Sequence, residues 1–146
     1  MTLSLTQAVA LVDAALARGR ELNFAPLTVA VLDPGGHLVA LKREDGSGIM
    51  RPEIAMGKAW GALGMGLGSR EMGERAAKVP HFANALMAAS GGRVVPVPGG
   101  VLIWKDGKLM GAVGISGDTS DNDEICALAA IAAIGCLGQT GATPPA

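Results

Sequence analysis

Apolar residues gather in two similar segments of the chain, and a tight turn divides each of them. In the first segment, residues 28–32 and 38–41 are apolar runs on either side of Asp33-Pro-Gly-Gly36. In the second, residues 101–104 and 109–116 flank a turn at Asp106-Gly107. β-Branched, apolar runs joined by Asp, Pro and Gly are the strongest short-range signal for antiparallel pairing. The pattern predicts two β-hairpins, over residues 28–43 and 101–117.

Apolar residues at helical spacing predict helices before, between and after the hairpins. Ser4 to Gln7 has the form of a capping box, and the apolar stripe behind it ends near residues 19–23. Pro52 suits the first position of a second helix, expected to run to about Leu67. Short helices are expected over residues 69–78 and 80–87, and an alanine-rich helix after the acidic segment 118–124, up to about Leu137. The prolines of residues 94–98 suit an edge strand.

This order of elements predicts an α+β fold, a helical sandwich around a five-stranded antiparallel sheet. We expect a single domain over residues 1–140 and a disordered tail over residues 141–146. A chain of this length buries roughly two thirds of its unfolded surface, which is enough for a real core.

The second predicted helix carries a ridge of glycines, at Gly57, Gly61, Gly64 and Gly68. Each interior glycine costs about 1 kcal/mol relative to alanine. Several together therefore indicate a close approach by another helix, the sheet or a flat ligand. Close packing in a soluble protein explains the ridge better than a membrane motif, because the helix is short and contains Lys58.

The amino-acid composition limits the classes of partner that we expect for this chain. The net charge is −1, aromatic residues make up 3% of the chain, and basic residues do not cluster, so a nucleic-acid partner is not expected. Charged residues make up only 17%, which favours a homo-oligomer. No uninterrupted apolar stretch is long enough to span a membrane, and the first residues lack the pattern of a signal peptide. We therefore expect a cytoplasmic protein.

The cysteines are expected to be free thiols in the core. Cys126 and Cys136 fall ten residues apart on one predicted helix. That spacing corresponds to about 15 Å, beyond the reach of a disulfide. Free thiols of this kind are typical of a reducing cytosol.

Several charged and polar residues are candidates for chemistry. Lys58 either extends to solvent or points into a pocket toward an aspartate or a substrate carboxylate. The acidic segment 118–124 has Asp123 and Ala129 where a calcium loop needs Gly and Glu, so it is predicted to cap the last helix through Thr119 or Ser120. Amides after Ser116 suit an anionic group.

The two histidines do not form a zinc motif, because they lie far apart in the sequence. His37 follows the first turn and is expected at the surface, whereas His81 begins a helix in more apolar surroundings. Either imidazole can donate a nitrogen to haem iron.

Four motifs in order resemble the GlcG/HbpS family, which includes the C-terminal domain of PduO-type cobalamin adenosyltransferases. The resemblance spans about residues 3 to 138. Its motifs are Val31-Leu-Asp-Pro-Gly-Gly-His-Leu-Val39, Glu53-Ile-Ala-x-x-Lys58-Ala59, Pro98-Gly-Gly100, and Gly111-Ala-Val-Gly-Ile-Ser-Gly117 with Asp123-Glu124. The resemblance implies a profilin-like α-β-α sandwich and homo-oligomers, octamers among them. It also implies a small-molecule ligand, and haem as the candidate cofactor.

Two functional hypotheses follow. A third possibility is an accessory oligomer that binds no ligand. In the first, the protein binds haem or a related carboxylate-bearing ligand between the sheet and the glycine-ridged helix. In the second, it is a cofactor-free isomerase, lyase or hydrolase of a small organic acid, with the amides of Gly99 and Gly100 as an oxyanion site. The catalytic candidates are Lys58, Glu53 and Asp123, the ligand-binding candidates Arg43, Pro98, Gly99, Gly100, Ser116 and His37, and the metal candidate His81.

Overall fold

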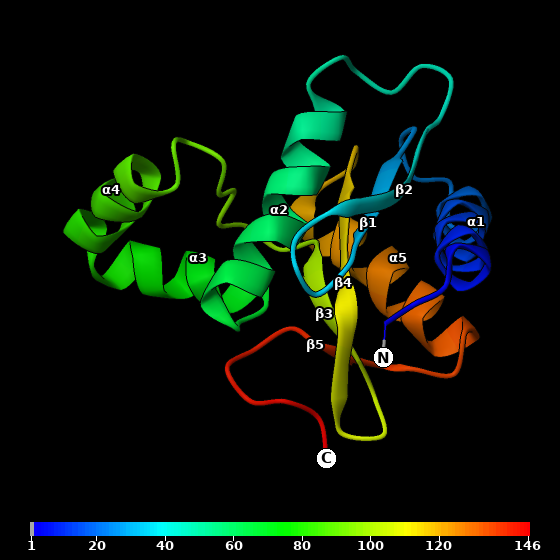
Figure 1. Cartoon of the computed structure of the whole chain (residues 1–146). Coiled ribbons are helices and arrows are strands. Elements are labelled where there is room, and N and C mark those ends of the chain that lie inside the picture. Colours follow the sequence, from blue (N-terminus) through cyan, green and yellow to red (C-terminus); the bar gives the residue numbers. More distant parts are fainter. Residues whose placement is uncertain (1) are drawn as a thin grey trace.

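A five-stranded antiparallel sheet with helices on both faces organises the molecule (Figure 1). The computed structural model describes residues 2–146. The strands follow the sheet order β2-β1-β4-β3-β5. Their bounds are β1 (Thr28–Leu32), β2 (Leu38–Arg43), β3 (Gly100–Lys105), β4 (Lys108–Ser116) and β5 (Leu137–Gln139). The predicted α+β fold and both predicted hairpins are confirmed.

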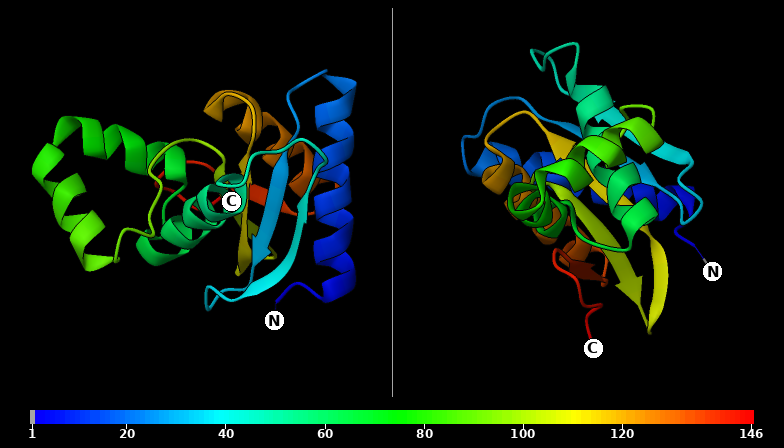
Figure 2. Two further views of the ribbon diagram at one scale, coloured as in Figure 1. Left: turned by 90° about the horizontal axis from the view of Figure 1, so that it is seen from above. Right: turned by 90° about the vertical axis from the view of Figure 1, so that its left-hand side faces the viewer.

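The helices cover the sheet unequally. They are α1 (Leu5–Glu21), α2 (Arg51–Met65), α3 (Ser69–Lys78), α4 (Pro80–Ala89) and α5 (Ser120–Ala133). Helices α1 and α5 pack together on one face, α2 covers the other, and α3 and α4 project from the α2 side as an arm (Figure 2). Within residues 2–146, no helix combines the length and the apolar character needed to cross a bilayer.

Helices α1 and α5 begin at the predicted capping residues. Ser4 Oγ accepts from the Gln7 amide, and the Gln7 side chain accepts from the Ser4 amide, which completes the capping box. Thr119 Oγ1 accepts from the Asn122 amide at 3.2 Å and caps α5, as the acidic segment predicts. Both caps satisfy amides that a helix leaves without an internal partner.

The two faces of the sheet differ in side-chain size. Val29, Val113 and Ile115 point into the large core beneath α1 and α5. Toward α2, β4 presents the small residues Ala112 and Gly114, and a Cβ added to Gly114 would lie 1.8 Å from the Ala55 carbonyl oxygen. Helix α2 therefore packs directly against the backbone of β4, and the position that we predicted for a flat ligand, between the sheet and α2, is filled by this contact.

The glycine ridge is occupied by the protein itself. A Cβ on Gly57 would lie 2.5 Å from the Arg93 carbonyl oxygen, and one on Gly61 would lie 3.0 Å from the Val94 side chain. Gly64 faces open space, and Gly68 lies beyond α2 against the backbone of Thr140. Close packing, the predicted reason for the ridge, is confirmed for Gly57 and Gly61.

The C-terminal part of the chain departs from the prediction. Helix α5 ends at Ala133 rather than near Leu137, because Gly135 adopts a left-handed conformation with φ +75°. Residues 137–139 then return to the sheet as β5, next to β3. The predicted strand over residues 94–98 is wrong; this proline-containing segment runs over α2 as a loop.

Cys136 therefore lies outside α5, so the predicted spacing along one helix is wrong. Both cysteines are nevertheless free and buried, as expected. Residues 141–146 form neither helix nor strand, and their disorder stays a prediction.

Candidate functional site

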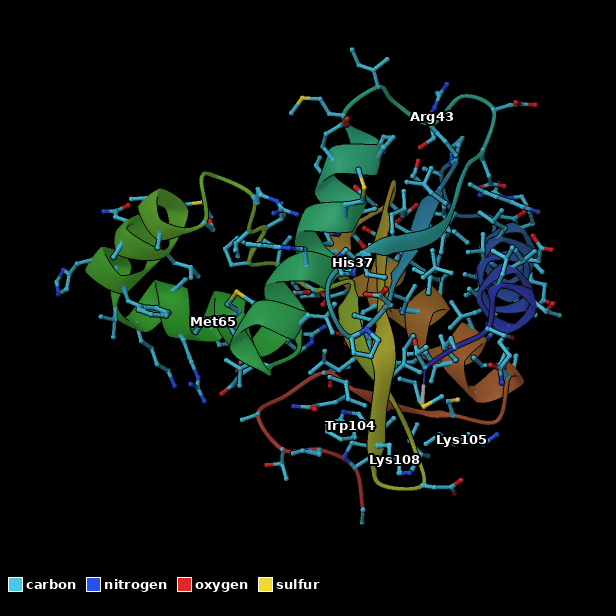
Figure 3. All side chains as sticks on the ribbon, viewed as in Figure 1. His37, Arg43, Met65, Trp104, Lys105 and Lys108 are labelled. Carbon is cyan, nitrogen blue, oxygen red and sulfur yellow. The ribbon has the colours of Figure 1, made fainter. Side chains whose placement is uncertain are left out.

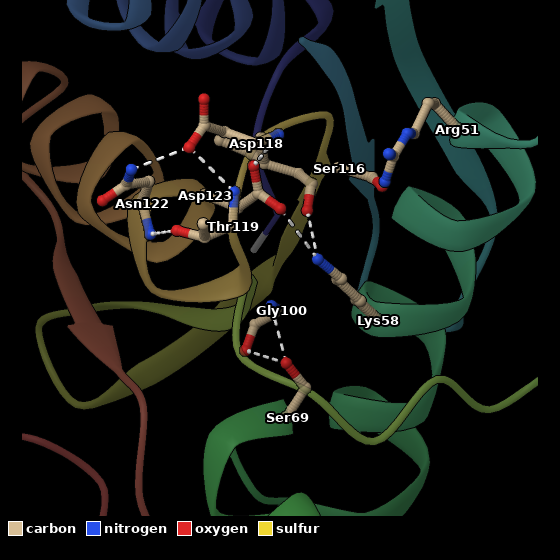
Figure 4. Close-up of polar contacts among 10 residues, drawn as sticks. Arg51, Lys58, Ser69, Gly100, Ser116, Asp118, Thr119, Asn122 and Asp123 are labelled. Carbon is tan, nitrogen blue, oxygen red and sulfur yellow. Dashed lines mark hydrogen bonds and ion pairs between the residues drawn. The ribbon is translucent and has the colours of Figure 1, made fainter. Parts of the chain in front are cut away.

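A buried ion pair lies at the end of the sheet where β4 leads into α5 (Figure 4). Lys58 Nζ donates to the Ile115 carbonyl oxygen at 2.8 Å and to Asp123 Oδ2 at 3.1 Å. The side chains are 2% and 1% exposed, respectively. Of the two alternatives for Lys58, the structure selects the inward one, toward an aspartate.

Neighbouring backbone encloses this pair. Asp123 Oδ1 accepts from the Asp118 amide at 3.0 Å. Gly99 adopts φ +121°, and a Cβ there would lie 2.9 Å from Lys58 Nζ. A Cβ on Gly100 would lie 2.3 Å from the Lys58 carbonyl oxygen. These two glycines are therefore needed for the close packing around Lys58.

Burial shifts both members of the pair toward their neutral forms. Desolvation lowers the pKa of Lys58, and the Arg51 charge lowers it further, although Asp123 opposes the shift. Desolvation likewise raises the pKa of Asp123 against the attraction of Lys58. Such shifts are common at catalytic sites, but buried structural pairs produce them too.

The polar groups beside the Lys58–Asp123 pair already have hydrogen-bond partners within the protein. Ser116 Oγ accepts from Arg51 at 3.0 Å. The Gly100 amide donates to Ser69 Oγ at 2.7 Å, so it is not free for the oxyanion that we predicted there. No buried side-chain nitrogen or oxygen of residues 2–146 lacks a hydrogen-bond partner. The hydrogen-bonding groups of this cluster therefore bond to one another.

The structure divides the predicted site residues into one cluster and several separate positions. The cluster at the end of the sheet contains Lys58, Asp123, Gly99, Gly100 and Ser116, with Pro98 just before it. The separate positions are Arg43, Glu53, His37 and His81.

Each separate residue has its own surroundings. Arg43 is on the edge strand β2 and donates to the Ser47 carbonyl oxygen at 2.6 Å. Glu53 lies on the solvent side of α2, and no hydrogen bond or ion pair within residues 2–146 joins it to the Lys58–Asp123 pair. His37 is at the β1–β2 turn, and His81 is exposed at the start of α4. Of the three catalytic candidates, Lys58 and Asp123 thus meet, and Glu53 stays apart from them.

A groove of about 520 Å³ opens where the β1–β2 turn, α2 and residues 92–95 meet. We call it the Trp60 groove. Its lining is mainly apolar and consists of Leu32, Gly36, Leu38, Met50, Glu53, Ile54, Met56, Gly57, Trp60, Gly92, Arg93 and Val95. Among these residues, sequence reasoning singled out only Glu53 as a site residue. The other lining residues come from three segments that lie far apart in the sequence. The signal that could have pointed to the groove is Trp60, a lone tryptophan in a glycine-rich helix.

The other hollow, of about 580 Å³, is bordered by charged residues of α1, β2 and the following loop. Two of its cations are engaged in ion pairs, Arg20 with Glu44 at 3.1 Å and Lys42 with Asp13 at 2.7 Å. This hollow therefore offers less to an apolar ligand than the Trp60 groove.

Two charged residues line the Trp60 groove, Glu53 and Arg93, and Arg93 is the cation. Its guanidinium carbon lies 3.9 Å from the centroid of the Trp60 ring. The salt bridges among residues 2–146 do not include Arg93. A stacked guanidinium without an acidic partner remains available to a ligand carboxylate.

Clusters suited to a free metal ion are not found in the described chain. No group of three or more His, Cys, Asp or Glu side chains converges within residues 2–146. Haem requires less of a protein, because its porphyrin fills four coordination positions and the chain supplies one or two axial ligands.

Comparisons with known proteins agree with this fold. Residues 3–132 match the family described as "Haem degrading protein HbpS-like". Protein GlcG of Escherichia coli K12 is 34% identical over 114 residues, which cover 78% of this chain and 81% of GlcG. The corrinoid adenosyltransferase PduO of Citrobacter freundii is 33% identical over 124 residues, 84% of this chain.

The chain spans about a third of that adenosyltransferase, since the match covers 36% of the longer protein. Among solved structures, the crystal structure of a PduOC–haem complex superimposes with a TM-score of 0.84 and 31% identity. The superposition covers 93% of this chain and 97% of the other. Sequence and structure together establish that the chain belongs to the HbpS-like family, with GlcG and the C-terminal domain of PduO as relatives.

Proposed function

We propose that this protein binds haem, or a related flat ligand carrying carboxylates, in the Trp60 groove. The observation that carries the proposal is the combination of an apolar groove with a stacked Arg93 that lacks an acidic partner. The similarity to a domain solved with haem bound supports haem as the ligand to test first.

The groove suits such a ligand in size and chemistry. Its volume, about 520 Å³, falls within the ~300–1,000 Å³ typical of small-molecule sites. Ile54, Met56 and Trp60 offer an apolar surface to a porphyrin ring, and Arg93 offers a bidentate donor for a propionate. Bound haem would supply the redox and ligand-exchange chemistry of its iron.

A haemin titration followed by absorbance tests the proposal. We expect a shifted Soret band that saturates with ligand. Arg93→Ala and Trp60→Ala should each weaken binding about tenfold, the loss of one charge-assisted bond or one aromatic contact. Arg75→Ala is the matched control, because Arg75 lies on α3 in an exposed pair with Glu71. Absence of any Soret shift with the wild-type protein would contradict the proposal.

Tryptophan fluorescence locates the ligand independently. The chain has two tryptophans, Trp60 in the groove and Trp104 in β3, where the indole donates to Gln139 at 2.9 Å. Haem in the groove should quench Trp60 emission strongly, so Trp104→Phe should retain the quenching. Trp60→Phe leaves only Trp104, which packs on the same small core cluster but does not line the groove, and should show weaker quenching. The opposite pattern would place the ligand elsewhere.

We also propose that the α3–α4 arm mediates self-association into a homo-oligomer. Helix α4 has no fully buried residue and packs only on α3, although Phe82, Leu86 and Met87 are apolar. The low charge content of the chain supports this assembly. Light scattering should show a smaller species for Phe82→Glu than for Asn84→Glu, the control on the same helix. Equal masses for wild type and both variants would contradict it.

A further inference from the structure

We infer that His37, oriented by Asp33, is the axial ligand for the iron of a haem in the Trp60 groove. This inference rests on the proposed function and adds the iron ligand to it. Neither histidine lines the groove itself, so the choice between them depends on where the β1–β2 turn lies and on what holds the imidazole.

The β1–β2 turn places His37 at the rim of the groove. Gly36 and Leu38, its two chain neighbours, both line the groove. A Cβ on Gly36 would lie 3.1 Å from Trp60 Cδ1, so the turn presses against the indole ring. Figure 3 shows His37 on this turn beside α2. An imidazole here can lean over a ligand whose face rests on Trp60.

Asp33 fixes the orientation and the tautomer of this imidazole. Its Oδ1 lies 3.1 Å from His37 Nδ1 and also accepts from the Gly35 and His37 amides, each at 2.9 Å. A carboxylate only accepts, so in the neutral imidazole Nδ1 carries the hydrogen and Nε2 presents its lone pair.

The resulting carboxylate–histidine arrangement is the usual support of a metal-bound imidazole. The His37 side chain is 81% exposed, so a ligand can reach Nε2 without displacing protein atoms. In contrast, His81 lies at the start of α4, which packs on α3, whereas the groove residue Gly92 bonds the last turn of α4, at the Met87 carbonyl oxygen. His81, whose apolar neighbours in the sequence favoured it as the iron ligand, is therefore the weaker candidate.

Other donors near the groove are thioethers. Met50 and Met56 line it and can occupy the second axial position, or compete with His37 for the first. The thiols do not compete, because Cys126 and Cys136 are buried in the core beneath α1 and α5.

The two histidines provide a matched pair of variants. We expect His37→Ala to lose the spectrum of a histidine-ligated haem, to bind haemin at least tenfold more weakly, and to regain the spectrum when imidazole is added. His81→Ala should match the wild type in both respects. Asp33→Asn keeps an acceptor oxygen but loses the charge, so we expect ligation to persist with about tenfold to hundredfold weaker binding and a more positive reduction potential.

The outcomes separate the two proposals. No haemin binding by the wild type overturns both. Wild-type binding with an unchanged His37→Ala spectrum overturns this inference alone, as does loss of the histidine-ligated spectrum in His81→Ala. Loss of axial ligation in Met50→Leu or Met56→Leu, with none in His37→Ala, assigns the iron to a thioether and also overturns it.

Discussion

Lys58 Nζ lies 3.1 Å from Asp123 Oδ2, although the two residues belong to helices on opposite faces of the sheet. The lysine side chain crosses the end of β4 and bonds the Ile115 carbonyl oxygen on the way. The pair therefore connects α2 to α5 past the edge of the sheet. Because both side chains are buried and enclosed, we interpret this connection as structural.

Removing one partner of this pair should destabilise the fold strongly. Lys58→Met leaves the Asp123 carboxylate buried without its counter-ion, which costs about 3–5 kcal/mol. In Lys58→Met/Asp123→Asn the buried charge is gone, and the new amide oxygen still accepts from the Asp118 backbone. Most of the free energy of unfolding should then return. Urea unfolding followed by circular dichroism measures the wild type, Lys58→Met, Asp123→Asn and the double variant.

The coupling free energy between the two substitutions decides whether the Lys58–Asp123 pair is structural. If the double variant loses the sum of the two single losses, the side chains do not interact and the structural interpretation is wrong. An equal loss in an exposed pair, Lys42→Met beside Asp13, would also contradict it, because exposed pairs contribute only about 0–1 kcal/mol.

The stability deficit of Lys58→Met should shrink as the pH falls. Burial raises the pKa of Asp123 above its ordinary value of 3.8, and loss of Lys58 removes an interaction that lowers it. A carboxyl group with a raised pKa in the folded state stabilises the fold while protonated. That contribution is lost as the pH rises through the folded-state value.

Comparison with the wild type at each pH isolates this effect. Asp33 and Asp118 have lowered pKa values because backbone amides donate to them, so acid destabilises the fold through both. The contribution of Asp33 is common to both proteins and cancels in the difference, whereas Asp118, whose charge raises the pKa of Asp123, acts together with Asp123. A deficit that stays constant from pH 7 down to pH 4 would show that Asp123 is not the unpaired charge.

Local signals in the sequence were sufficient for the hairpins and the caps. The Asp33 and Asp106 turns, the Ser4 capping box and the Thr119 cap each depend on residues within a few positions of one another. Such features are readable from one sequence because their physical cause is local.

Long-range contacts were not predictable in this way. The partner of Lys58 is Asp123, 65 residues away, and only the folded sheet brings them together. The Trp60 groove combines three segments, and β5 pairs with β3 only after Gly135 has ended α5. The alanine-rich run gave no sign of that return, because its apolar residues fit a continued helix equally well.

Two glycines provide a test of the close contact between α2 and the sheet. A Cβ at Gly114 would lie 1.8 Å from the Ala55 carbonyl oxygen, a backbone atom that cannot rotate away. We expect Gly114→Ala to destabilise the protein by more than about 3 kcal/mol, in the range of severe overpacking. Thermal and urea unfolding measure the loss.

Gly64→Ala is the matched control in this test. Gly64 is in α2, and nothing lies within 4 Å of an added Cβ. Alanine there should stabilise the protein by about 0.5–1 kcal/mol through helix propensity. A mild effect of Gly114→Ala, similar to that of Gly64→Ala, would mean that α2 does not rest on β4 as described.

Both thiols should be unreactive in the native protein. Burial raises the pKa of Cys126 to about 11 and also raises that of Cys136, so little thiolate is present at neutral pH. At pH 8, roughly one Cys126 thiol in a thousand is ionised, and the thiolate is the reactive form. We expect iodoacetamide to modify neither cysteine in native protein and both in urea, as mass spectrometry can measure. Rapid native alkylation of Cys126, with Cys136→Ala as the single-thiol control, would contradict the closed core beneath α1 and α5.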